Sequence, residues 1–77
     1  MTTTDSITVY VRKGVEKHER ILSFIPPEGF SQTELIESGW ALDGNQALRA
    51  ISIGQLHSTE SKLADSFRQK GYETFFC

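Results

Sequence analysis

The feature that most constrains the fold is a short apolar segment, residues 19–25 (ERILSFI), which two consecutive prolines close. Successive side chains of a β-strand point to opposite faces. Leu22 and Phe24 would therefore share one face, and Ile21 and Ile25 would share the other. A strand that is apolar on both faces must be covered on both. We therefore predict a central strand of a small sheet, with the helices elsewhere in the chain as its cover.

An alternating segment, residues 7–12 (ITVYVR), precedes this strand. Its β-branched and aromatic residues alternate with polar ones, which is typical of a half-buried strand. We predict that Ile7, Val9 and Val11 face the core, and that a charged connection containing Gly14 joins the two strands into a hairpin. The residues expected near the hairpin tip are Arg12, Lys13, Lys17, His18 and Arg20.

A short helix is predicted after the two prolines. Ser31 is a good N-cap, Glu34 stands three residues later as in a capping box, and Phe30 precedes them as a candidate staple. The helix should turn Leu35 and Ile36 inward. We expect it to end before a glycine, residue 39, with the following tryptophan folded back over the helix as in a Schellman motif.

Residues 43–54 allow two interpretations. In the first, Asp43 and Gly44 form a hairpin turn. The strand after this turn would place on one face Arg49, Ile51 and Ile53. In the second, Asp43 caps a helix. Its apolar stripe would consist of Ala47, Leu48 and Ile51. We favour the hairpin, because residues 51–53 are β-rich and Gly54 would end a helix soon after it formed.

The last third of the chain predicts a helix and a strand. Ser58 can cap a helix in which Leu63 and Phe67 recur at helical spacing, and Gly71 should end it. Residues 72–77 then form a final strand. The predicted fold is an α+β domain in the order β-β-α-β-β-α-β, with a small, mainly antiparallel sheet and two short helices. Residues 1–6 are expected to be a flexible tail, and residues 7–77 a single domain.

The composition is that of an ordinary globular chain, with 38% hydrophobic and 23% charged residues. Its single cysteine, Cys77, allows no intrachain disulfide, so nothing indicates an oxidising compartment. No segment has the roughly 20 apolar residues that a membrane span requires. We expect a cytoplasmic protein without a membrane anchor.

The candidate catalytic and metal-binding residues are few and scattered. His18 and His57 lie far apart, whereas a metal site needs several ligands converging at about 2.0 to 2.3 Å. The pair Glu34 and Glu37 would share a helix face, but acid–base chemistry requires environments that separate the two pKa values. The glycines do not form a phosphate-binding loop. We therefore predict no enzymatic activity, no metal and no cofactor.

The charge distribution gives the leading functional hypothesis. The net charge is -2, and residues 21–48 contain acidic residues but no Lys or Arg. Such an acidic tract suits electrostatic steering toward a protein partner. We predict a non-enzymatic protein-binding module, of the kind of phage or plasmid accessory inhibitors that occupy a host protein surface through an acidic face. The predicted contact residues are Glu28, Glu34, Glu37, Trp40 and Asp43.

Two other kinds of partner, single-stranded nucleic acid and a second copy of the chain, match other parts of the sequence. A basic and aromatic hairpin is typical of proteins that bind single-stranded nucleic acid, although the negative net charge disfavours this alternative. Its contact residues would be Tyr10, Arg12, Lys13, Lys17 and Arg20. Residues 72–77, with Phe75 and Phe76 on opposite faces and little charge, could also pair two copies of the chain if this strand lies at a sheet edge.

Overall fold

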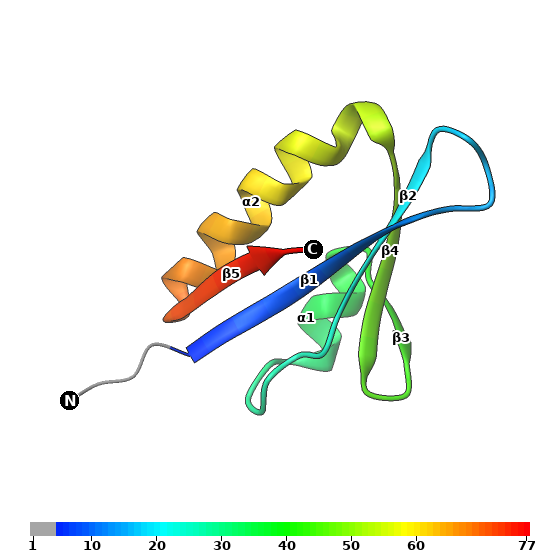
Figure 1. Cartoon of the computed structure of the whole chain (residues 1–77). Helices are drawn as coiled ribbons and strands as arrows, with labels where there is room; N and C mark the ends of the chain where they lie inside the picture. The colour runs from blue at the N-terminus through cyan, green and yellow to red at the C-terminus, as the bar shows by residue number, and fades with distance from the viewer. Residues whose placement is uncertain (1–4) are drawn as a thin grey trace.

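The strand β2 (Glu19–Phe24) lies at the centre of a five-stranded sheet with the order β3-β4-β2-β1-β5. The structure is a computed structural model that describes residues 5–77 (Figure 1). In chain order the elements are β1 (Asp5–Lys13), β2, α1 (Gln32–Glu37), β3 (Ala41–Asp43), β4 (Gln46–Ser52), the 3₁₀ turn η1 (Ile53–Gln55), α2 (Leu56–Gln69) and β5 (Tyr72–Phe76). The predicted α+β class is confirmed, and the predicted order of strands and helices agrees with the structure.

The sheet is mixed. Strand β2 pairs antiparallel with β1 and β4, and β4 pairs antiparallel with β3. Strand β5 instead runs parallel to β1, because α2 carries the chain back across the sheet before β5 begins. Asp5 and Ser6 pair with β5, so they belong to the sheet and not to the predicted tail. The rest of that predicted tail, residues 1–4, lies outside the described residues.

The hairpin interpretation of residues 43–54 is correct. Asp43 pairs with Gln46, so the two-residue loop consists of Gly44 and Asn45, one position later than predicted. Gly44 has a φ of 62°, while Asn45 has no positive φ, which is the pattern of a type II′ turn. Helix α2 begins earlier than expected, after η1. Ser58 therefore lies inside its first turn, where its Oγ donates to the carbonyl of Gln55 at 3.3 Å, and is not the N-cap.

Helix α1 has the predicted caps. The Ser31 hydroxyl accepts a hydrogen bond from the Glu34 backbone N–H at 3.3 Å. At the other end, the Trp40 N–H donates to the Leu35 carbonyl at 3.0 Å, and Gly39 has a φ of 94°. This is the Schellman arrangement, and it returns Trp40 to the sheet. Ile36 is 59% exposed, so its predicted inward orientation is wrong: a helix of six residues turns only one side, that of Leu35, to the sheet.

Both helices pack on the same face of the sheet, as Figure 1 shows. The centre of this face is Phe24, whose ring lies 4.9 Å from that of Trp40 and 5.2 Å from that of Phe67. The predicted inward residues Ile7 and Val9 are buried there, and Val11 is partly buried. We call this side of the sheet the covered face. Its buried core consists of Ile7, Val9, Leu22, Phe24, Leu35, Trp40, Ala47, Ile51, Leu63 and Phe67.

The prediction that β2 is covered on both faces is wrong. Leu22 and Phe24 are 0% and 1% exposed, but Ile21 on the opposite side is half-buried, and Tyr10 of β1, which pairs with Ser23 on that side, is 47% exposed. The physical reason is that residues 5–77 contain two α-helices, and both pack on the covered face. No second layer remains for the other side of the sheet.

Candidate functional site

The strand register collects a set of side chains on the other side of the sheet. Directly opposed residues of neighbouring strands point to the same face. Tyr10 pairs with Ser23, and Ser23 pairs with Leu48. In the next row, Arg12 pairs with Ile21. On the edge strand β5, Phe75 pairs with Thr8 and therefore shares this face with Tyr10. We call this side the uncovered face, and its larger side chains are Tyr10, Arg12, Ile21, Leu48 and Phe75.

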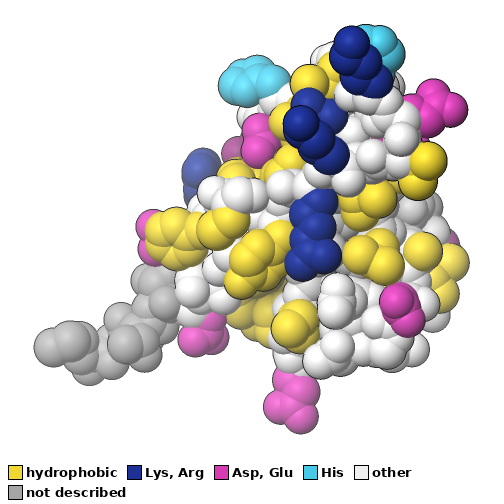
Figure 2. Space-filling view, turned by 45° about the vertical axis from the view of Figure 1, so that its right-hand side comes forward, with side chains coloured by type: hydrophobic (Ala, Val, Ile, Leu, Met, Phe, Trp, Pro, Cys, Tyr) yellow, Lys and Arg dark blue, Asp and Glu magenta, His cyan; other side chains and the backbone are white. Residues whose placement is uncertain are grey.

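The uncovered face is mixed, with exposed apolar side chains among polar ones such as Thr8 and Ser23, of which Ser23 is only 5% exposed. Tyr10 is 47% exposed and Phe75 is 49% exposed, while Ile21 and Leu48 are half-buried among their neighbours. Figure 2, which brings the right-hand side of Figure 1 forward, shows a surface of this mixed kind, with apolar side chains on both sides of a column of Lys and Arg side chains. Contiguous exposed apolar surface is a mark of interaction sites.

The charges on the uncovered face are arranged by position. Arg12 stands on the inner strand β1, and no residue from 5 to 77 forms an ion pair with it. Glu73 on β5 and Asp43 on β3 have the same orientation as their neighbours Phe75 and Ala41, and they occupy the two edge strands. The face therefore has one cation on an inner strand and carboxylates on both edge strands, with a further carboxylate, that of Glu19, at the turn end of β2.

The residues predicted for nucleic-acid binding are only partly brought together. Tyr10 and Arg12 share the uncovered face, whereas Lys13 and Lys17 are exposed at the hairpin end. Arg20 belongs to the opposite side, because it pairs with the buried Ile51, and it donates to the carbonyls of Lys17 and Glu19 at 3.3 and 2.9 Å. Its guanidinium is thus partly used in holding the turn.

Phe75 is the site residue that the sequence argument missed as a neighbour of Tyr10. The two aromatic residues belong to strands at opposite ends of the chain, and they become neighbours only because β5 pairs parallel with β1. The adjacent Phe75 and Phe76 indicated one aromatic per face, but the sequence did not show which strand would lie beside them. β5 is an edge strand, as the predicted homodimer requires, and the homodimer itself stays a prediction.

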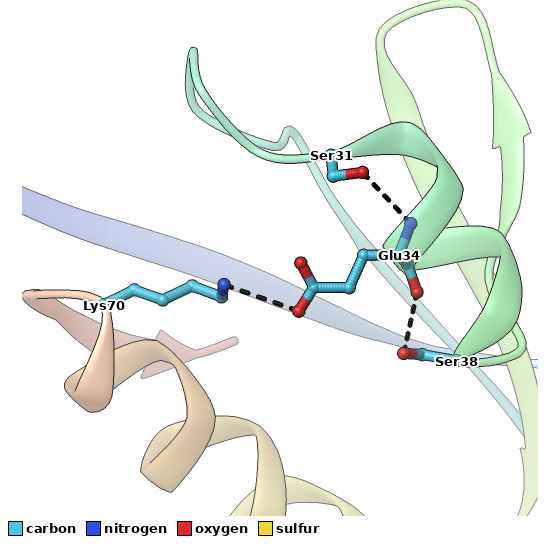
Figure 3. A network of polar contacts seen from close by, with 4 residues as sticks. All are labelled: Ser31, Glu34, Ser38 and Lys70. Carbon is cyan, nitrogen blue, oxygen red and sulfur yellow. Dashed lines mark hydrogen bonds and ion pairs between the residues drawn. The ribbon is translucent and has the colours of Figure 1, made fainter.

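The predicted acidic contact surface needs one correction. Trp40 is only 4% exposed and packs edge-on against Phe24, so it belongs to the core and not to the exposed acidic surface. Glu34 is exposed, but its Oε1 lies 3.5 Å from the Nζ of Lys70, which joins α1 to the end of α2 (Figure 3). The remaining predicted contacts are exposed, and they are Glu28 before α1, Glu37 on α1 and Asp43 on β3.

The candidate catalytic groups lie apart. His18 lines a hollow of about 350 Å³ at the turn end of the first hairpin, together with Glu16 and Glu19. The Glu19 carboxylate is already engaged, since its Oε1 accepts a hydrogen bond from the Val15 N–H at 3.0 Å. His57 is exposed on α2. In the part of the chain that the structure describes, no three His, Cys, Asp or Glu side chains gather as metal ligands would.

Neither α-helix between residues 5 and 77 combines the length and the apolar composition that crossing a bilayer requires. The single thiol, Cys77, is free and exposed beside the edge strand. Comparisons of the chain with protein-family models, with curated proteins and with solved structures found no match.

Proposed function

We propose that this chain is a non-enzymatic protein-binding module whose contact surface is the uncovered face of its sheet. The observation that carries the proposal is that both helices lie on one face of the sheet, while Tyr10 and Phe75 are about half exposed on the other. Apolar surface removed from water contributes about 25 cal/mol per Å². Placing a protein partner on this face would therefore supply free energy of association.

The chemistry of the face specifies a partner surface. Aromatic residues and arginine are enriched at the energetic centres of protein interfaces. Tyr10, Phe75 and Arg12 provide these groups, so the partner should present an apolar centre with a carboxylate facing Arg12. The margins carry Glu73 and Asp43, which favour basic residues at the partner's rim.

The inhibitor role remains a prediction from size and charge. Of its predicted acidic contacts, Asp43 lies on the uncovered face, at the end of β3. Glu34 is less available because Lys70 partly neutralises it. An accessory inhibitor of this design would combine an apolar contact with acidic margins, and would not depend on the acidic tract alone.

A comparison of three variants tests the protein-binding proposal. Tyr10→Ser combined with Phe75→Ser removes the two aromatic anchors of the uncovered face. Ile36→Ser removes an equally exposed apolar side chain, 59% exposed on α1, and serves as the matched control. Partners captured from the native cell extract by the wild-type chain should bind the double variant about a hundredfold or more weakly, because truncated anchors each cost about 2 kcal/mol or more.

The control variant Ile36→Ser should retain the wild-type affinity, and Arg12→Glu should slow association in a salt-dependent manner. Equal affinities for the double variant and for Ile36→Ser would exclude the uncovered face as the contact surface. Folding of each variant is checked by circular dichroism, because a general loss of structure would weaken all contacts alike.

Single-stranded nucleic acid is a second candidate partner. Tyr10 and Phe75 stand at diagonal positions on neighbouring strands of one face, with Arg12 two residues further along β1. Aromatic side chains on a sheet surface next to cations are a recurring platform for unpaired bases. Titration of the protein with a labelled single-stranded oligonucleotide at low salt tests this hypothesis, and the absence of binding under these conditions would exclude it.

A further inference from the structure

A second candidate site lies on the helical side of the sheet, in a cleft between α1, α2 and β4. Its volume is about 190 Å³. The floor of the cleft is apolar and consists of Leu35, Trp40, Leu63 and Phe67. Its cations are Arg49, Lys62 and Lys70. A second hollow of about 170 Å³ shares Arg49, Lys62 and Leu63 with it, and extends the cleft along the first turns of α2.

We infer that this cleft binds a small organic anion, a carboxylate or phosphate attached to an apolar group, with Arg49 as its anchoring cation. Arg49 pairs with Leu22, which is fully buried, so its side chain starts on the covered face. Its Nε lies 3.9 Å from the position that a β-carbon would take at Gly39, so the side chain extends toward the end of α1.

Within residues 5–77 no carboxylate forms an ion pair with Arg49, whose side chain is half-buried. Removing a cation from water is unfavourable unless a counter-charge accompanies it. A carboxylate or phosphate in the cleft would supply that counter-charge, and its oxygens suit the two-pronged hydrogen bonding of a guanidinium.

The surroundings of Arg49 are also net positive, in a chain whose net charge is -2. Lys62 and Lys70 line the same cleft, and Glu34 is the only carboxylate among the residues that line it. Glu34 lies 3.5 Å from Lys70, as Figure 3 shows, and the Lys70 ammonium also lies 5.4 Å from the centre of the Phe30 ring. This leaves the positive charges of Arg49 and Lys62 free to attract an anion.

The apolar floor of the cleft determines which group can be attached to the anion. A cavity of about 150 Å³ lined by apolar side chains is large enough to hold a benzene ring. The cleft therefore has room for one small aromatic or branched aliphatic group against Leu63 and Phe67, with the anionic group directed toward Arg49. This site is distinct from the uncovered face, and the inference does not depend on the proposed protein binding.

The chain contains its own reporter for this site. Trp40 is the only tryptophan, it is 4% exposed, and it lines the cleft, so its fluorescence responds to a bound ligand. The probes are phenyl phosphate and benzoate, with benzyl alcohol as a neutral analogue and inorganic phosphate as an anion without an apolar group. We expect a saturable change with phenyl phosphate or benzoate, and binding about tenfold or more weaker for the two comparison compounds. Whether phenyl phosphate or benzoate binds tighter separates a phosphate site from a carboxylate site.

Matched variants assign the anion to Arg49. Arg49→Gln should weaken binding of the better probe about tenfold or more, because hydrogen bonds to charged groups are involved. Arg68→Gln is the control, since Arg68 is exposed on α2 and pairs with Asp65 at 3.7 Å outside the cleft. Should Arg49→Gln fail to fold, Lys62→Gln replaces it, because Lys62 is exposed and also lines the cleft; a weakening of about threefold is expected there.

Three results would overturn the inference. The first is the absence of a saturable change with both phenyl phosphate and benzoate at millimolar concentration. The second is binding of benzyl alcohol as tight as that of either anion. The third is equal affinity of the cleft variant and of Arg68→Gln. None of these results bears on the uncovered face, so failure of this inference and failure of the proposed protein binding are distinguishable.

Discussion

The two faces of the sheet are built from the same strands but differ in what shields them from water. Leu22 and Phe24 on the covered face are 0% and 1% exposed, while Tyr10 and Phe75 on the uncovered face are 47% and 49% exposed. An apolar side chain on the covered face is therefore used for folding. One on the uncovered face contributes less to folding and remains available to a partner. An apolar strand indicates that side chains need to be buried, but the number and placement of the helices decide which face of the sheet is buried.

The covered face is itself uneven. Its centre is closed by the rings of Phe24, Trp40 and Phe67, with the Phe24 centroid 4.9 and 5.2 Å from the other two. Its flank between the helices instead contains Arg49 and a cleft of about 190 Å³. The helices thus shield the middle of the sheet fully and leave one side of it accessible to a small molecule.

The largest expected effect on the free energy of unfolding is that of truncating an aromatic residue on the covered face, compared with one on the uncovered face. Phe24→Ala on the covered face should lower the free energy of unfolding by about 3 to 5 kcal/mol, because it opens a cavity between Trp40 and Phe67. Phe75→Ala on the uncovered face, where the ring is 49% exposed, should lower it by about 1 kcal/mol or less. Urea unfolding followed by circular dichroism measures both values. Similar losses for the two variants would mean that the uncovered face also carries folding energy.

The next effect concerns the turn that brings Trp40 onto the covered face. Gly39 has a φ of 94°, a left-handed conformation that costs other residues about 1 to 2 kcal/mol. Gly39→Ala should therefore lower the free energy of unfolding by that amount. The control is Gly54→Ala, because Gly54 has no positive φ and a β-carbon there would meet nothing within 4 Å. Thermal unfolding compares the two, and an equal change in both would show that the strain at Gly39 is unimportant.

A change of opposite sign is expected at the edge strand. The Thr74 hydroxyl is buried on the covered face, opposite Ile7, and no described residue forms a hydrogen bond with it. Thr74→Val removes this hydroxyl at nearly constant volume, so it should raise the free energy of unfolding by about 1 kcal/mol. Thr8→Val, opposite Phe75 on the uncovered face, should change it by less than about 0.5 kcal/mol. If Thr74→Val is destabilising instead, the hydroxyl has a partner and the covered face is not dry at this edge.

Much of the fold could be predicted because its signals are local. The Ser31 cap and the Gly39 terminus each depend on a few neighbouring residues whose chemistry favours one arrangement, and the hairpin near Asp43 was the favoured one of two interpretations. The start of α2 was harder to predict. The extra turn η1 lets the helix begin at Leu56, before the serine that resembled its cap.

The candidate site was less predictable because it depends on pairing across the whole chain. Tyr10 and Phe75 share one face only through the parallel pairing of β1 with β5. Trp40 was predicted as a contact residue, yet the turn at Gly39 places it in the core. The placement of the helices likewise determines which side of β2 remains uncovered. The alternation of residues 19–25 would be the same whichever side the helices covered.

The smallest expected effect concerns the ion pair between the helices. Lys70 and Glu34 lie 3.5 Å apart, with side chains 39% and 61% exposed, so solvent screens most of their attraction. A double-mutant cycle with Lys70→Gln and Glu34→Gln should give a coupling free energy of about 0.2 to 0.5 kcal/mol, vanishing near 1 M salt. The contact of Lys70 with Phe30 does not enter this coupling, because it is lost equally in both backgrounds. A coupling above about 1.5 kcal/mol would mean that charge, and not apolar packing on the covered face, holds the two helices in place.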